Sequence, residues 1–240
     1  MNPSHAKPDQ APSPRKRRWF QFSLRTVLIV VTLLCIGPGG YVAHEQRKAR
    51  KQKAAVEAIE KLGGYVHYDK ELPVRSAMLR QILGKHSYGK ARLVGLRDIQ
   101  VSDADLVHLA ELKNLTDLWL DDTHVTDAGL VHLDGLRTLR FLSLDNTQVT
   151  DAGMVHLAEL KNLEFLLLDF AQVTDAGLVH LAELKNLTLL SLRDTQVTDA
   201  GLVHLAGLKN LKKLSLFSTQ VTDAGVAELQ KALPGCNIVR

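Results

Sequence analysis

The sequence predicts an α/β solenoid, a curved parallel sheet with short helices on its convex side, preceded by a single transmembrane helix. Copies of Val-Thr-Asp-Ala-Gly-Leu-Val-His-Leu recur every 24 residues, and a fixed period of this length is typical of solenoids. They begin at Val101, Val125, Val149, Val173, Val197 and Val221. Before each copy, leucines two residues apart are typical of a strand that buries alternate side chains. An uncharged run near the N-terminus predicts the transmembrane helix.

Charge is unevenly distributed along the chain. Residues 1–53 contain 11 of the 30 Lys and Arg residues but only the acids Asp9 and Glu45, a net of +9, so −5 of the total of +4 falls on the remainder. An acidic body argues against nucleic-acid binding, which needs a basic face. Cys35 and Cys236 are too isolated to predict a disulfide or a cysteine metal site.

Residues 1–18 are expected to form a disordered basic tail, since they are rich in proline and poor in apolar side chains. Residues 19–43 are expected to cross the lipid bilayer: the last 18 carry no charge, and as a helix they would extend roughly 27 Å. A cleaved signal peptide is the alternative, because small residues follow the apolar core. Basic residues flank both sides, and we expect the repeats on the extracytoplasmic side.

Two segments are expected between the membrane and the repeats. Residues 44–62 contain no Gly or Pro and show apolar residues at helical spacing, which predicts a juxtamembrane helix. Residues 63–90 are expected to cap the first open edge of the solenoid. In this cap, Gly63 and Gly64 end the helix, the alternation from Tyr65 to Asp69 predicts a strand, and Pro73 begins a second short helix.

Residues 91–232 form the repeats, each with the pattern Leu-x-x-Leu-x-Leu-x-x-Thr-x-Val. After the strand, Asp151 is predicted to be a helix N-cap, Leu157 and Leu160 lie on the buried side of the helix, and Asn162 is predicted to end it in the left-handed conformation. Residues 233–240 are expected to form a C-terminal cap, in which Ile238 takes the place of a strand leucine.

These motifs resemble the leucine-rich repeat family over residues 91–240. The Val-Thr-Asp-Ala-Gly-Leu segment looks like the 24-residue variety related to the cysteine-containing repeats of F-box adaptor proteins, with Thr123, Thr147, Thr195 and Thr219 at the usual Asn or Cys position. Ala171 departs from this pattern, which predicts a looser turn. The basic head, apolar segment and Gly-Gly-Tyr cap look like bacterial membrane-anchored proteins of this type. No F-box is recognisable, so ubiquitin chemistry is not expected.

The strands of such a solenoid line a concave face, where outward side chains are expected to bind a partner. Large apolar side chains rimmed by carboxylates predict another protein or peptide, with an apolar anchor and basic flanks. The candidate partner-binding residues are Asp117, Trp119, Asp121, Phe141, Asp145, Phe165, Leu167, Asp169, Phe170, Leu189 and Arg193. The alternative is that these rings only pack on one another or on the flanking helix.

Catalysis is not expected, because no unique nucleophile, base and orienting group occur together. Ser143, Ser191 and Ser215 occupy the same position in different repeats, and no repeat has a histidine at that position. A histidine column runs along the helices, at His108, His132, His156, His180 and His204, and a half-exposed structural position explains it better than zinc. No cofactor is expected. The alternatives to a binding scaffold are an envelope component without a specific ligand and a metal-responsive ladder that includes the Asp121, Asp145 and Asp169 carboxylates.

Overall fold

The computed structural model describes residues 43–44, 46–69 and 89–240. The chain divides into two compact units, residues 1–46 and 47–240, and the second contains the repeats. Among the described residues, no helix has the length and apolar character needed to cross a membrane. The predicted tail and the predicted second cap helix lie outside the described residues, as does the predicted transmembrane helix apart from its last residue.

A helix through residues 46–61 covers the first strands, where the sequence predicts a juxtamembrane helix. It buries Ala55, Val56 and Ile59 in the same core as the repeats. Gly63 has a φ of 93°, a conformation that a side chain would strain, and the helix ends before it. The basic side chains of the helix stay exposed, including that of Lys51, which pairs with Glu111 at 2.8 Å. This helix is therefore amphipathic.

The strands form one sheet whose spatial order follows the sequence. The strands are β1 (Tyr65–Tyr68), β2 (Ala91–Gly95), β3 (Asp117–Trp119), β4 (Phe141–Ser143), β5 (Phe165–Leu167), β6 (Leu189–Ser191), β7 (Lys213–Ser215) and β8 (Asn237–Val239). β1 is antiparallel to β2, and every later pair is parallel. Ile238 pairs with Leu214, as the sequence predicts.

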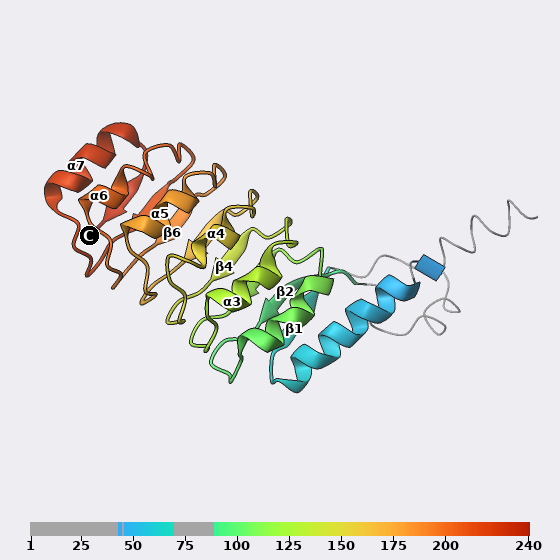
Figure 1. The fold of residues 1–240 in the computed structure, drawn as a ribbon. Coiled ribbons are helices and arrows are strands. Elements are labelled where there is room, and N and C mark those ends of the chain that lie inside the picture. Colours follow the sequence, from blue (N-terminus) through green and yellow to red (C-terminus); the bar gives the residue numbers. More distant parts are fainter. Residues whose placement is uncertain (1–42, 45, 70–88) are drawn as a thin grey trace, which may run out of the picture. The chain divides into compact units, whose positions relative to one another are not determined.

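Short helices follow the strands on one side of the sheet (Figure 1). They are η2 (Asp103–Glu111), α3 (Asp127–Leu130), η3 (Val131–Leu133), α4 (Met154–Leu157), α5 (Asp175–Leu181), α6 (Asp199–Leu202) and α7 (Asp223–Ala232). The strand and helix leucines meet between the two layers in one continuous buried core. One repeat is therefore a strand, a turn and a short helix, and only stacking buries its leucines.

The turn after each strand places one residue in the left-handed conformation. These residues are Asp98, Asp122, Asn146, Phe170, Asp194 and Ser218, with φ between 50° and 60°. In four turns the following threonine donates its hydroxyl to the carbonyl three residues before, as Thr147 does to Leu144 at 2.7 Å. Ala171 lacks this bond, yet its N–H still bonds Leu168 at 3.2 Å. The turn predicted to be looser therefore keeps the backbone conformation of the others.

The predicted N-cap at Asp151 is wrong, and so are its equivalents in the other repeats. In α3, α5, α6 and α7 the N-cap is the threonine one residue earlier, as Thr174 Oγ1 accepts from Ala176 N at 3.3 Å. The aspartate instead bonds to the next repeat, because Asp151 accepts from Thr174 N at 2.8 Å and from Thr174 Oγ1 at 2.6 Å. We call these contacts the Asp–Thr ladder. They pair Asp103, Asp127, Asp151, Asp175 and Asp199 with Thr126, Thr150, Thr174, Thr198 and Thr222.

The ladder also explains the repeated glycine. A Cβ on Gly177 would lie 2.5 Å from Asp151 Oδ1, so a larger residue would displace the carboxylate that joins the two repeats. Asn162 has no positive φ, and its predicted left-handed stop is wrong. Its side chain donates to Arg137 O at 2.7 Å, which forms a second contact between repeats. Cys236 is a buried free thiol, and burial raises its pKa.

Candidate interaction surface on the strand face

The strands point alternate side chains away from the helices, toward the face that the sequence predicts to be concave. We call this the strand face. It presents three columns of residues at 24-residue spacing, which begin at Asp117, at Trp119 and, just after the end of β3, at Asp121. The first column and the middle column are in register because each strand pairs with the next at equivalent positions. The predicted partner-binding residues on the strands all lie in these columns, and Phe170 lies in the turn beyond β5. The three columns differ in character.

Aromatic rings cross the first part of the strand face in a row. The Trp119 and Phe141 ring centroids lie 4.3 Å apart, and those of Phe141 and Phe165 lie 6.3 Å apart. We call these three residues the aromatic row. Phe165 is 37% exposed and the other two rings are partly buried. The rings therefore pack on one another, as the alternative interpretation expects, and still present area to solvent.

A groove of about 590 Å³ borders the row where the strands begin. Its lining combines two rings of the row with charged and polar side chains: Asp69, Arg92, Thr116, Asp117, Arg140, Phe141 and Phe165. Arg92 Nε donates to Asp69 Oδ2 at 2.8 Å, and Arg140 bonds Glu164 with two nitrogens. The groove therefore has an apolar wall beside paired charges.

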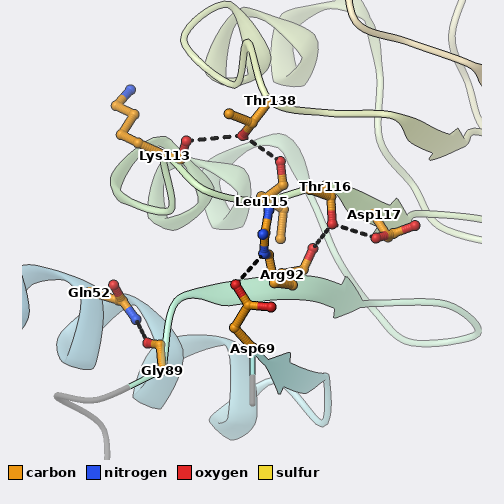
Figure 2. A network of polar contacts seen from close by, with 9 residues as sticks. All are labelled: Gln52, Asp69, Gly89, Arg92, Lys113, Leu115, Thr116, Asp117 and Thr138. Carbon is orange, nitrogen blue, oxygen red and sulfur yellow. Dashed lines mark hydrogen bonds and ion pairs between the residues drawn. The ribbon is translucent and has the colours of Figure 1, made fainter. Parts of the chain in front are cut away.

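Figure 2 shows the polar contacts that fix this groove. Thr116 Oγ1 lies 3.0 Å from Arg92 O and 2.6 Å from Asp117 Oδ2. Gln52 donates to Gly89 O at 2.8 Å, which attaches the helix through residues 46–61 to the start of β2. Asp117 has no ion pair among the described residues, so its carboxylate is available to a basic partner.

The carboxylates form a column at the other end of the strands. In chain order this column holds Arg97, Asp121, Asp145, Asp169, Arg193 and Phe217. Asp121 is buried and pairs with Arg97 at 2.9 Å. Asp169 accepts from the Arg193 backbone N–H at 2.9 Å, and its other oxygen lies 4.0 Å from Arg193 Nε. The two arginines thus bracket three aspartates, and Asp145 in the middle has no cation.

Asp145 is the electrostatically strained member of the column. The pKa of Asp145 is raised to about 6, mainly by burial and also by the neighbouring charges of Asp169, Asp121 and Asp122, while a hydrogen bond from the Asp169 backbone N–H lowers it. This bond is 2.7 Å long and uses only Oδ1. Stacked like charges are unfavourable unless a cation intervenes.

The serines of the middle column do not project freely from the strand face. Ser143, Ser191 and Ser215 are all buried, which corrects the expectation that outward residues escape the core. Three buried polar atoms have no hydrogen-bond partner in the described part of the chain: Trp119 Nε1, Asp121 Oδ1 and Ser143 Oγ. Trp119 and Ser143 are register partners. Ser143 precedes Asp145 by two residues, and Asp121 occupies the position equivalent to Asp145 one repeat earlier.

The remaining predicted residues lie at the margins of this arrangement. Leu167 and Leu189 are partly buried on β5 and β6. Phe170 is 56% exposed and has a φ of 60°, a conformation that is unusual for a bulky side chain. No ring contact joins Phe170 to the aromatic row among the described residues. Of the predicted aromatic residues, only Trp119, Phe141 and Phe165 are therefore joined by ring contacts among the described residues.

Sequence reasoning missed the arginines that accompany the predicted residues. Arg97 lies exactly one repeat before Asp121, so extending the column back by 24 residues identifies it. Its guanidinium also stacks over the Trp119 ring at 4.9 Å. Arg92 pairs with Asp69, and nothing in the repeat pattern signals that contact because Asp69 precedes the repeats. Arg140 and Glu164 are again 24 residues apart.

Within the described residues, no serine is hydrogen-bonded to a histidine, and no group of three His, Cys, Asp or Glu side chains could hold a metal ion. The histidine column is half-buried on the helices, where the sequence places it, and His156 contacts Asp134 at 3.1 Å.

A family model described as leucine rich repeat matches residues 135–158, 183–206 and 207–229. The chain contains leucine-rich repeats. Other units fall outside this match, although they share its strand register. The match does not distinguish the variety related to F-box adaptors. No curated protein sequence matches the chain.

The leucine-rich repeats are similar to several solved bacterial structures. The internalin InlF of Listeria monocytogenes has 24% identity over 58% of this chain, with a TM-score of 0.50. Internalin C2 of the same species has 26% identity over 65% of this chain and 76% of its own, with a TM-score of 0.47. A Leptospira interrogans leucine-rich repeat protein has 25% identity over 56% of this chain and 39% of its own, with a TM-score of 0.41. The chain spans only 38% of InlF, so this likeness concerns the fold.

Proposed function

We propose that this protein is a membrane-anchored leucine-rich repeat scaffold that binds another protein or peptide through its strand face, without catalysis. The aromatic row is the observation that carries the proposal. Exposed aromatic rings beside charged groups are typical of binding hot spots. The row also lies on rigid strands, so a partner would meet a preorganised surface at a small cost in conformational entropy.

The charges around the row favour a partner with basic flanks. Asp117 lies at the beginning of β3 and the aspartate column at the other end of the strands. Asp121 follows Asp117 by four positions, just after the end of β3, which corresponds to roughly 13 Å in extended backbone. A partner with an apolar anchor over the rings can therefore place basic groups near both ends, and opposite charges favour specificity and fast association.

Photo-crosslinking with the full-length chain tests the use of this face. A benzophenone amino acid replaces Phe165 on the strand face or, as the control, Val179 on the helix side, which is 47% exposed. In cells that naturally contain the protein, we expect a discrete crosslinked product from position 165 and none from position 179. With the crosslinker at position 167 instead, Phe141→Ser should lower the yield of the crosslinked product severalfold. Val155→Ser, on the exposed helix side, should leave that yield unchanged.

The crosslinking pattern separates the alternatives. Crosslinks from position 179 alone would move the binding surface to the helices and refute the proposal. Absence of crosslinks from every strand-face position in a correctly folded protein would favour the envelope component without a specific ligand. A shift of the melting temperature by calcium or zinc would instead revive the metal-responsive ladder.

The membrane anchor belongs to the proposal and rests on the uncharged run within residues 19–43. We propose that the repeats lie on the extracytoplasmic side. Protease treatment of intact cells, with an epitope added after Arg240, tests both points. Loss of the epitope while the N-terminal part stays in the membrane fraction is expected. A protected epitope that becomes sensitive only after cell lysis would place the repeats in the cytoplasm, and release of the uncleaved protein from membranes would refute the anchor.

A further inference from the structure

The aspartate column has a single uncompensated position. Arg97 neutralises Asp121 at one end, and Arg193 approaches Asp169 at the other. Asp145 lies between them, and its Oδ2 has no hydrogen bond or ion pair within the described part of the chain. Among the described residues, the column thus has two arginines beside three aspartates, and Asp145 is the aspartate without an ion pair.

Buried polar atoms beside Asp145 indicate a built site. The Asp121 side chain is only 5% exposed, and its Oδ1 has no donor. Ser143 is 1% exposed, and its Oγ has no partner. Ser143 lies two residues before Asp145, on the same face of the same chain segment, and Asp121 occupies the equivalent position one repeat earlier. Buried groups of this kind cost free energy unless they find a partner.

We propose that the partly exposed Asp145 carboxylate binds one guanidinium group, an arginine side chain of the partner protein, at a subsite whose walls include the buried Asp121 and Ser143. The identity of the partner rests on the proposed function above. A guanidinium offers several N–H donors in a planar fork, which can serve acceptors on neighbouring strands about 4.8 Å apart. It is also more weakly hydrated than an ammonium group, which suits a half-buried site.

A metal ion fits these residues less well. Parallel strands separate equivalent carboxylates by about 4.8 Å, whereas a calcium ion needs several oxygens within about 2.6 Å of one point. No cluster suited to a metal is found among the described residues. Arg97 provides an internal precedent for the preferred occupant, because its guanidinium both pairs with Asp121 and stacks over Trp119.

The subsite should respond to pH. Asp145 faces the carboxylates of Asp121, Asp122 and Asp169, with Arg97 and Arg193 as the cations of the same column. A cation binds the ionised form of Asp145, whose pKa is raised to about 6. Binding should therefore be about tenfold weaker at pH 5 than at pH 7.5, since only about a tenth of the carboxyl is ionised at pH 5.

Titration of the full-length protein with n-butylguanidinium tests the subsite. The ¹³C signal of the Asp145 carboxyl is followed by NMR at constant ionic strength, at pH 7.5 and at pH 5. We expect a saturable shift, a lower pKa of Asp145 in the presence of the cation, and weaker binding at pH 5. Asp145→Asn should abolish saturable binding, whereas Asp194→Asn, on an exposed turn residue, should not.

Three results would overturn the subsite: a shift that does not saturate, equal binding by Asp145→Asn, or preferential binding of calcium or n-butylammonium. The crosslink at position 165 then distinguishes this inference from the proposed function. If Asp145→Asn loses n-butylguanidinium binding but keeps the crosslink at full yield, the partner does not use the subsite, although the strand face still binds it. If n-butylguanidinium binds and no strand-face crosslink forms, the subsite stands and the proposed function fails.

Discussion

Two sets of aspartates recur in this chain at the same 24-residue spacing, and their environments are opposite. The aspartates of the Asp–Thr ladder each accept two hydrogen bonds from the next repeat, as Asp127 does from Thr150 N and Oγ1. In the column on the strand face, Asp145 receives one backbone hydrogen bond and no cation. The same residue type thus joins repeats on one side and is left incompletely paired on the other.

The two sets of aspartates differ in whether the next repeat provides a side-chain donor. Each aspartate of the ladder needs a threonine donor in the following repeat. The dipeptide Thr-Asp recurs in every repeat from Thr126 to Thr222, so this donor is present each time. The strand-face aspartates occupy only three successive repeats and end at arginines. The backbone N–H of the residue 24 positions later donates to Asp145 and to Asp169, but no side-chain donor recurs for these aspartates, and their ion pairs come from Arg97 and Arg193. Periodic pairing is structural, and an interrupted, unpaired column is the better candidate for binding.

The largest expected effect comes from breaking the ladder at its centre. Asp151→Ala removes both bonds to Thr174 and leaves a partly buried N–H without a partner. We expect a loss of about 3 kcal/mol in the free energy of unfolding, measured by urea denaturation. Asp151→Asn keeps one acceptor and should lose about 1 kcal/mol. Equal losses for the two variants would contradict the assigned bonds.

The glycine opposite the ladder should give the next largest effect. Gly177→Ala would place a Cβ against the Asp151 carboxylate, so we expect a loss of about 2 kcal/mol from the displaced hydrogen bonds and the overpacking. Gly235→Ala is the control, because a Cβ there meets nothing within 4 Å. Urea denaturation should show no loss for the control. A stable Gly177→Ala protein would mean that the ladder tolerates displacement.

On the strand face, removing a charge should stabilise the protein in a pH-dependent way. Burial, followed by nearby carboxylates, raises the pKa of Asp145 from 3.8 to about 6. The folded state therefore binds more protons than the unfolded state between these values, and the stability of the native chain falls as pH rises through this window. Asp145→Asn avoids this loss.

We expect Asp145→Asn to be more stable than the native chain by about 1 kcal/mol at pH 8, after allowing for the partial exposure of the carboxylate. Below about pH 3 both proteins should be equally stable, because Asp145 is then largely protonated whether folded or unfolded. Thermal denaturation across about pH 2.5 to 8 measures the difference. A destabilised variant at pH 8 would show that the column is already compensated.

The smallest effect concerns the turn at Phe170. Asparagine tolerates the left-handed conformation better than phenylalanine, so Phe170→Asn should raise the free energy of unfolding by about 0.5 kcal/mol. Phe217→Asn is the control, since Phe217 is also exposed but its φ is not positive. Chemical denaturation should show a gain for the first only. Weaker crosslinking at position 165 by the stabilised variant would indicate that Phe170 belongs to the binding surface.

The repeat unit, its strand and the leucine core could all be predicted from the amino-acid sequence. Leucines two residues apart at a constant 24-residue interval leave no other way to bury every unit, since one repeat has no core of its own. The same periodicity placed β8 at Ile238 and put Trp119, Phe141 and Phe165 on one face. Local patterns determine these features because parallel strands in register place equivalent residues of each repeat side by side.

The tertiary structure alone decided which polar groups meet. The role of Asp151 was not visible in its own repeat, because its partner Thr174 lies 23 residues away. The burial of Ser143 and the lack of an ion pair at Asp145 among the described residues depend on which side chains the neighbouring strands bring close. Hydrogen bonds and charges act over a few ångströms in space, and local sequence patterns do not report those distances.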